Sequence, residues 1–202
     1  WLRSSPEIHM KQVLSDDLPK IYQLGPCFRN EGELAPWHHP EFTMLEWYDS
    51  TTNYDDFMTQ TEDLLRYTYR KMIKEMPCKS SFSLPDRPFQ RISVGDAFKE
   101  FCQIDLIDGD QELGKKAKAR GVFSIRGDED FETAFYKLLL DVVEPQLAKL
   151  RACILYDYPA SQAALAKVSG AVAKRFEIYI DGHELCNAFY ECLDSKENKN
   201  RI

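Results

Sequence analysis

The order of predicted strands and helices is the feature that most constrains the fold. Along the 202-residue chain, strand-like segments alternate irregularly with helical ones, and the last two strands, 175–181 and 184–193, are separated only by a turn at Gly182. A doubly wound parallel sheet would instead alternate strands and helices regularly. The sequence therefore predicts an α+β fold in which helices flank an antiparallel sheet.

Individual elements are predicted from apolar spacing and from signals at their ends. Pro6 marks the first position of a short helix, and Asn53 caps a long amphipathic one. Ser93 begins a variant capping box with Asp96, and Pro145 is expected to end the helix before it. The other predicted elements are strands at 21–24, 27–31, 41–48 and 152–158, and helices at 110–120, 129–143 and 159–168. The strands at 27–31 and 41–48 are expected to form an antiparallel hairpin with a long mobile tip.

Composition excludes several classes of function. The net charge is −7, so the chain has no overall basic field for nucleic acid. There is no apolar run of about 18 residues and no signal peptide, so neither a membrane span nor secretion is expected. No glycine-rich phosphate loop of the GxGxxG or GxxxxGK[ST] type occurs. The six cysteines lack CxxC or zinc spacing, which favours buried thiols in a cytoplasmic protein.

Two segments concentrate polar and charged side chains on predicted strands. The first comprises FRNE at 28–31 and HHPEFTMLEWY at 38–48. Alternation places Arg29 and Glu31 on one side of their strand, and Phe42, Glu46 and Tyr48 on one side of the next. A hairpin with only a structural role would carry apolar residues there, because buried charges cost several kcal/mol unless they are paired. The alternative is a structural ion pair of Arg29 with Glu46 or Glu31 on a solvated face.

The second segment is RFEIYIDGHELCNAFYE at 175–191. Asn187, Phe189 and Glu191 alternate onto a single face of the predicted strand. Glu184 is out of phase with Asn187 by one residue, which predicts a bulge or kink between them. The alternative interpretation is an ordinary polar edge strand.

Together these segments resemble motifs of the class II aminoacyl-tRNA synthetases, in the lysyl, aspartyl and asparaginyl group. The resemblance implies the catalytic core of that family, acting on ATP. It implies that Arg29 contacts the α-phosphate and the carboxylate as the catalytic residue, Glu31 reads the adenine amino group, His38 meets the γ-phosphate, and Phe42 stacks on adenine. His39 stands where asparagine is frequent, so which histidine faces ATP is open.

The resemblance also implies a metal site and an amino-acid site. Glu177 and Glu184 match the positions that hold Mg²⁺ between the ATP phosphates, and hard oxygen ligands are what Mg²⁺ prefers. Several carboxylates around one small pocket repel each other unless a cation is bound, which favours a diamino acid such as lysine or β-lysine. The expected amino-acid contacts are Ser5, Glu7, Glu46, Tyr48, Asn187, Phe189 and Glu191.

The resemblance spans nearly the whole chain, and two members of the group compete. Residues 1–202 are expected to be most of one catalytic domain of a homodimer, with the first and third signature motifs outside the chain. The local sequences of three segments, 5–11, 44–48 and 158–166, favour the shorter paralog that transfers lysine or β-lysine to a lysine of elongation factor P. The alternative is a lysyl-tRNA synthetase that charges tRNA. A third possibility is a non-catalytic paralog that only binds a partner or an amino acid. The intact motif residues disfavour this third possibility.

Overall fold

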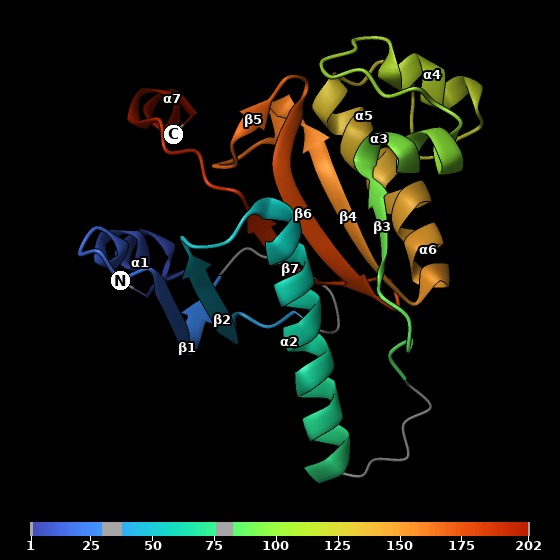
Figure 1. Cartoon of the computed structure of the whole chain (residues 1–202). Coiled ribbons are helices and arrows are strands. Elements are labelled where there is room, and N and C mark those ends of the chain that lie inside the picture. Colours follow the sequence, from blue (N-terminus) through green and yellow to red (C-terminus); the bar gives the residue numbers. More distant parts are fainter. Residues whose placement is uncertain (1, 30–37, 76–82, 202) are drawn as a thin grey trace. The chain divides into compact units, whose positions relative to one another are not determined.

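The computed structural model describes residues 2–29, 38–75 and 83–201 (Figure 1). The chain divides into two compact units, Trp1–Asn53 and Tyr54–Ile202. None of the helices in the described segments combines the length and apolar character needed to span a membrane.

The first unit pairs a short helix with a two-stranded sheet. Helix α1, Glu7–Leu14, begins after Pro6, which is the N-cap residue and lies one position earlier than predicted. Strands β1, Lys20–Phe28, and β2, Glu41–Asp49, pair antiparallel, which confirms the hairpin. The two short strands predicted before the hairpin loop are one continuous strand. Gly25 lies within this strand and pairs with Met44.

The second unit is built on a five-stranded sheet. The strands are β3 Gln90–Ser93, β4 Ala152–Pro159, β5 Val168–Ser169, β6 Val172–Ile180 and β7 His183–Phe189. The order is β3-β4-β6-β5, with β7 also paired to β6. All pairs are antiparallel except β3 with β4, which is parallel. The predicted α+β class is therefore confirmed, with one parallel pair at the β3 edge.

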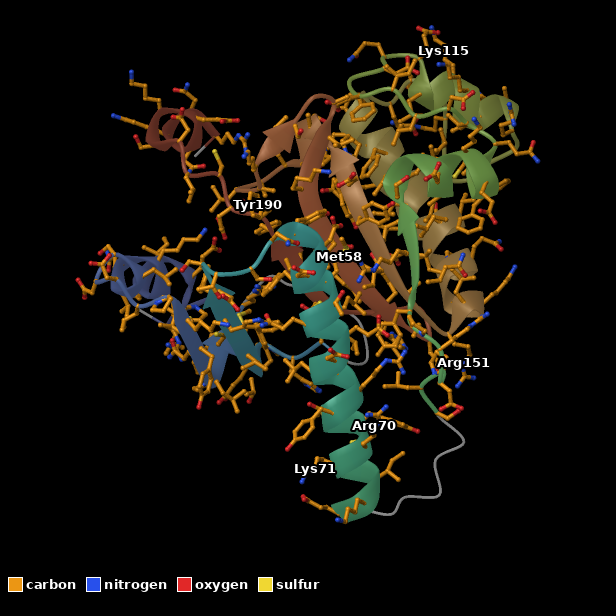
Figure 2. The ribbon with its side chains drawn as sticks, in the orientation of Figure 1. Met58, Arg70, Lys71, Lys115, Arg151 and Tyr190 are labelled. Atoms are coloured by element: carbon orange, nitrogen blue, oxygen red, sulfur yellow. The ribbon has the colours of Figure 1, made fainter. Side chains whose placement is uncertain are left out.

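Helices cover both faces of this sheet. Helix α2, Tyr54–Glu75, begins directly after Asn53 and packs Met58 against Phe176 and Ile178 of β6 (Figures 1 and 2). Leu155 and Tyr179 belong to a second hydrophobic cluster, because side chains of a strand alternate between faces. The helices of that cluster are α3 Val94–Ala97, η1 Phe98–Cys102, α4 Leu113–Ala119, α5 Phe131–Leu138, η2 Leu139–Val143 and α6 Glu144–Leu147.

Two sequence predictions about helices are wrong. The helix expected to end at Pro145 continues through the π-turn η2 into α6, where Pro145 lies in the first turn and needs no N–H partner. The helix expected at 159–168 is reduced to the single 3₁₀ turn η4, Ala160–Gln162. Backbone groups of this segment bond to other segments instead, for example the carbonyl of Leu165 to the N–H of Cys192. Two further helical segments are η3, Ala148–Leu150, before β4, and α7, Ser195–Arg201, after β7.

The predicted capping box of α3 is confirmed. Ser93 is the N-cap, and its hydroxyl accepts a hydrogen bond from the N–H of Asp96 at 3.0 Å. The same hydroxyl donates to the Asp96 carboxylate at 2.6 Å. The cap therefore joins the end of β3 to the start of the helical layer.

We expect Ser93→Ala to lower the free energy of unfolding by about 1 kcal/mol, because the first turn of α3 loses its side-chain acceptor. Urea denaturation followed by circular dichroism measures the change. The matched control is Ser169→Ala, at an exposed strand position of β5 that caps no helix. Equal stability of the two variants would contradict the capping role.

Candidate active site

In the first unit, the carboxylate of Glu46 is held by two hydroxyl groups. Ser5 Oγ donates to one carboxylate oxygen at 3.0 Å, and the Tyr48 hydroxyl donates to the other at 2.7 Å. Glu46 and Tyr48 are two residues apart on β2 and so share a face, while Ser5 comes from the turn before α1. Three of the predicted amino-acid contacts are therefore brought together.

A salt bridge on α1 extends this group. The Ser5 hydroxyl also accepts from the backbone N–H of Glu7 at 3.1 Å. The Glu7 carboxylate pairs with Lys11 Nζ at 2.7 Å, and this ammonium lies 5.9 Å from the ring centroid of Tyr48. Contacts thus run in a closed circuit through five residues, which we call the Glu46 cluster: Ser5, Glu7, Lys11, Glu46 and Tyr48. Lys11 was not among the predicted amino-acid contacts, although a Glu–Lys pair four residues apart in a helix is a recognisable signal.

The charge balance of the Glu46 cluster favours a cationic ligand. It contains two carboxylates and one ammonium, and Lys11 pairs with Glu7. Within the described residues, the Glu46 carboxylate accepts from the neutral hydroxyls of Ser5 and Tyr48, which satisfy its oxygens without cancelling its charge. An ammonium group on a ligand would complete this balance.

Arg29 follows β1 directly and stacks on Phe42. The guanidinium carbon lies 5.2 Å from the centroid of the Phe42 ring, and the Arg29 N–H donates to the carbonyl of Pro40 at 2.9 Å. Arg29 and Glu46, both described, form no ion pair, so the Glu46 form of the structural alternative is wrong, while its Glu31 form is untested. Glu31 lies outside the described residues. His38 and His39 are both exposed at the start of β2.

In the second unit, a buried ion pair lies on β6. Glu177 is only 3% exposed, and its carboxylate lies 2.6 Å from Arg175 Nη2. Its other oxygen accepts from the Tyr179 hydroxyl at 2.7 Å. Burial, followed by the charges of Glu177, Glu144 and Glu184, raises the pKa of Tyr179 well above its ordinary value, so the hydroxyl stays protonated and donates.

The predicted bulge between Glu184 and Asn187 is confirmed. Ile178 pairs with Cys186, but Tyr179 pairs with Glu184, so Leu185 is the extra residue on β7. Asn187 lies opposite Glu177. Because of the bulge, Glu184 and Asn187 share one face of the sheet with Glu177.

Arg175 connects this face. Its Nε donates to Oδ1 of Asn187 at 3.2 Å, and its guanidinium lies 5.8 Å from the ring centroid of Phe189. We call Arg175, Glu177, Tyr179, Asn187 and Phe189 the Arg175 cluster. Sequence reasoning missed Arg175, although it stands two residues before Glu177 on the same strand and so on the same face.

Glu191 is the one predicted contact of this segment that leaves the strand. β7 ends at Phe189, and Glu191 pairs with Ala166 in an isolated bridge. The backbone changes partner there, since Tyr190 bonds to the carbonyl of Lys174 and accepts from the N–H of Lys167 (Tyr190 is labelled in Figure 2). The prediction that the strand continues to Leu193 is therefore wrong.

Glu177 and Glu184, on one face of the β6–β7 pair, are more typical of a Mg²⁺ site than of a site in which protein side chains supply every metal ligand. Within the described ranges, no three His, Cys, Asp or Glu side chains gather as a metal site. Mg²⁺ is usually bound through one or two carboxylates and substrate phosphates, and Glu177 and Glu184 supply two carboxylates on one face. The two carboxylates are therefore candidates for an ion that also binds phosphates.

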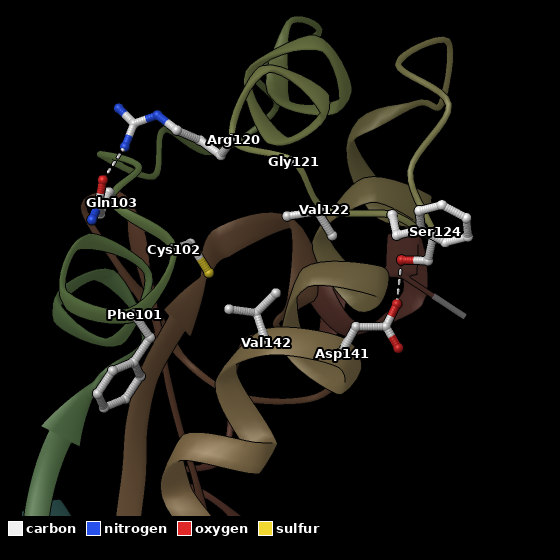
Figure 3. Close-up of a pocket in the computed structure, with 10 residues that line it drawn as sticks. Phe101, Cys102, Gln103, Arg120, Gly121, Val122, Ser124, Asp141 and Val142 are labelled. Carbon is white, nitrogen blue, oxygen red and sulfur yellow. Dashed lines mark hydrogen bonds between the residues drawn. The ribbon is translucent and has the colours of Figure 1, made fainter.

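A separate cavity lies among the helices of the second unit. Its volume is about 600 Å³, and its lining includes Cys102, Arg120 and Asp141 (Figure 3). Arg120 donates to the side chain of Gln103 at 2.9 Å, and Ser124 bonds to Asp141. The cavity contains none of the predicted site residues. Nearby on α4, Lys115 pairs with Glu112 at the surface, as expected for a solvated helix face (Figure 2).

Comparison with known proteins decides the family. The family described as tRNA synthetases class II (D, K and N) matches residues 1–202. The chain belongs to this family. It is 37% identical over 207 residues to the elongation factor P–(R)-beta-lysine ligase of Proteus mirabilis. Those of Photorhabdus laumondii and Haemophilus influenzae are 38% and 36% identical, and each alignment covers all of this chain. The chain spans about three-fifths of the length of these relatives, 58–59%.

The contacts of Glu46 can be tested by substitution. If Glu46 binds the ammonium of a lysine-type substrate, Glu46→Gln in the full-length protein should raise the KM for lysine by about 30-fold or more while the KM for ATP changes little, because the ammonium loses its charged partner, an effect of roughly 2–5 kcal/mol. ATP–pyrophosphate exchange measures both constants.

The matched control for this variant is Glu41→Gln, at an exposed position on the opposite face of β2. It should leave both constants unchanged. Equal losses in lysine and ATP dependence in Glu46→Gln would make Glu46 a structural residue.

Proposed function

We propose that residues 1–202 form most of the catalytic domain of a ligase that activates lysine or β-lysine with ATP. The product of activation is an aminoacyl-adenylate, and the acceptor is a lysine of elongation factor P. The observation that carries the proposal is the Glu46 carboxylate, held by Ser5 and Tyr48 beside the paired Glu7. Such a site favours a ligand with amino groups over aspartate or asparagine. The names of the relatives support the acceptor.

The residues of the first unit suit the activation step. The substrate carboxylate attacks the α-phosphorus of ATP, the bond to the β-phosphate oxygen breaks, and pyrophosphate leaves. The Arg29 guanidinium holds the attacking carboxylate and the α-phosphate in line through its forked donors. Phe42, already in contact with Arg29, stacks on adenine. Glu31 and His38 complete the ATP contacts, at the adenine amino group and the γ-phosphate.

The residues of the second unit suit the phosphates and the amino acid. Glu177 and Glu184 would hold Mg²⁺, which neutralises charge on the ATP phosphates. Asn187, Phe189 and Glu191 contact the amino acid. In the transfer step, the neutral amine of the acceptor lysine attacks the adenylate carbonyl. An amide forms, AMP leaves with the bonding electron pair, and the amine loses a proton.

A tRNA acceptor is the second candidate, because the family includes lysyl-tRNA synthetases. The chain has 33 acidic and 26 basic residues, whereas a tRNA ligand requires several phosphates to be neutralised. This balance favours the protein acceptor. A paralog that only binds a partner is disfavoured by the presence of Arg29, Phe42 and both carboxylates at 177 and 184.

A homodimer and a cytoplasmic location are also proposed. One face of the β1–β2 sheet exposes Tyr22 and Leu24, at 77% and 65%, beside Leu45 of β2. Apolar side chains gathered on one sheet face are typical of a surface that another chain covers. The cytoplasm is where a translation factor would meet the enzyme.

We expect the full-length enzyme to label elongation factor P and not lysine tRNA. The experiment supplies ATP, labelled α- or β-lysine, and either purified factor or purified tRNA. A matched control uses the factor with its acceptor lysine replaced by arginine. Efficient charging of tRNA with the factor unlabelled would overturn the acceptor and leave the adenylate chemistry intact.

Removing either predicted metal carboxylate should slow adenylate formation. Glu177→Gln and Glu184→Gln should each reduce the exchange rate by about 10²–10³-fold and raise the Mg²⁺ concentration that is required, because charge on the phosphates is less well neutralised. Glu132→Gln, at an exposed position of α5, is the matched control. Unchanged Mg²⁺ titrations of both site variants would remove these residues from the metal site.

A further inference from the structure

Arg175 contacts more residues of the candidate site in the second unit than a simple ion pair with Glu177 would require. Its three nitrogens reach three different acceptors. Nη2 lies 2.6 Å from Glu177, Nε donates to Asn187 at 3.2 Å, and Nη1 donates to the carbonyl of Gln162 at 3.3 Å. One planar group thus fixes a predicted metal carboxylate and a predicted amino-acid contact relative to each other.

The guanidinium itself is firmly placed. The Arg175 side chain is only 13% exposed. It lies 4.4 Å from the ring centroid of Tyr158, whose side chain is completely buried, and 5.8 Å from that of Phe189. Its backbone carbonyl accepts from the Tyr54 hydroxyl at 2.7 Å, which anchors this point of β6 to α2. Burial alone would lower the pKa of Arg175, but the neighbouring charge of Glu177 raises it, so the group remains a cation.

The position of the Asn187 side chain depends on Arg175 more than the position of the Glu177 side chain does. Glu177 has a second donor in Tyr179, so it keeps one hydrogen bond if Arg175 changes. Asn187 is exposed, and Arg175 Nε is the donor that its side-chain oxygen has within the described residues. With that oxygen occupied, the amide NH₂ of Asn187 is directed away from Arg175 and is available to donate to a ligand oxygen.

We propose that Arg175 is a positioning residue for the amino acid, which acts by orienting Asn187 while it neutralises Glu177. The inference rests on the proposed function, because it assigns Asn187 to the amino-acid site. Arg175 touches no substrate in this account. Its guanidinium is required because a lysine ammonium is a single point of charge that can pair with Glu177 but cannot also reach Asn187 and Gln162 in the same geometry.

The test compares Arg175→Lys, Asn187→Ala and the double variant in the full-length enzyme. Calorimetric titration with lysine or β-lysine, without ATP or Mg²⁺, measures the dissociation constant of the amino acid. We expect Arg175→Lys and Asn187→Ala each to weaken binding by about tenfold or more, as for loss of a hydrogen bond to a charged group. The double variant should bind no more weakly than the weaker single variant, because both changes remove the same interaction.

Other results would overturn the proposal. Unchanged binding in Arg175→Lys, or losses that add in the double variant, would make Arg175 a structural residue that does not act through Asn187. The KM for ATP of Arg175→Lys should stay within about threefold of the unaltered enzyme, since the ion pair with Glu177 is retained, and a parallel loss for ATP would contradict the assignment.

If Arg175→Lys does not fold, the double variant Arg175→Gln with Glu177→Gln is used in its place. This variant leaves no unpaired buried charge. This variant should bind the amino acid about tenfold more weakly than Glu177→Gln alone, and equal binding would overturn the proposal. Lysine-dependent exchange by the unaltered enzyme tests the proposed function separately. If another amino acid supports exchange instead, the same comparison is made with that amino acid.

Discussion

Strand β6 carries an arginine and a glutamate inside the protein, and each is tolerated there because it neutralises the other. An unpaired buried carboxylate costs several kcal/mol, and removing one partner of such a pair typically costs 3–5 kcal/mol. The 2.6 Å contact of Arg175 with Glu177 is therefore the interaction on which this face of the sheet depends. Tyr179, Asn187 and the β7 bulge are arranged around it.

The two clusters hold carboxylates in different ways, and this difference suggests a division of work. Glu177 is balanced by a guanidinium, so it has little charge left for a monovalent ligand. Glu46 is held by two hydroxyl groups, which orient it and leave its negative charge available. The second arrangement suits the ammonium of an amino acid, whereas a metal ion at Glu177 would take most of its charge balance from Glu184 and from the phosphates of ATP.

Local signals in the sequence were sufficient for much of the fold. The capping box at Ser93 and the bulge between Glu184 and Asn187 follow from residues three positions apart, and the hairpin of β1 and β2 follows from strand-like segments on either side of its loop. Two helix predictions failed for different reasons. Pro145 lies in the first turn of α6, where a proline is tolerated, and residues 159–168 form only a single 3₁₀ turn because their backbone groups bond to other segments.

The candidate site shows the same limit. Ser5, Glu46 and Tyr48 were predicted together and meet in the structure, whereas Arg175 was missed. It is a cation beside a carboxylate, a pattern that in a single sequence is equally typical of surface pairs. Its importance comes from its burial and from its three acceptors, which only the three-dimensional structure contains.

We infer that the carboxylates of Glu7 and Glu46 select an amino acid with a second amino group. The most direct measurement is ATP–pyrophosphate exchange by the full-length enzyme with lysine, β-lysine, norleucine and aspartate. Norleucine keeps an unbranched apolar side chain but lacks the terminal ammonium. The account predicts exchange with lysine or β-lysine and at least about 30-fold less with norleucine and aspartate, as expected for loss of a charged partner. Equal exchange with norleucine, or exchange only with aspartate, would contradict it.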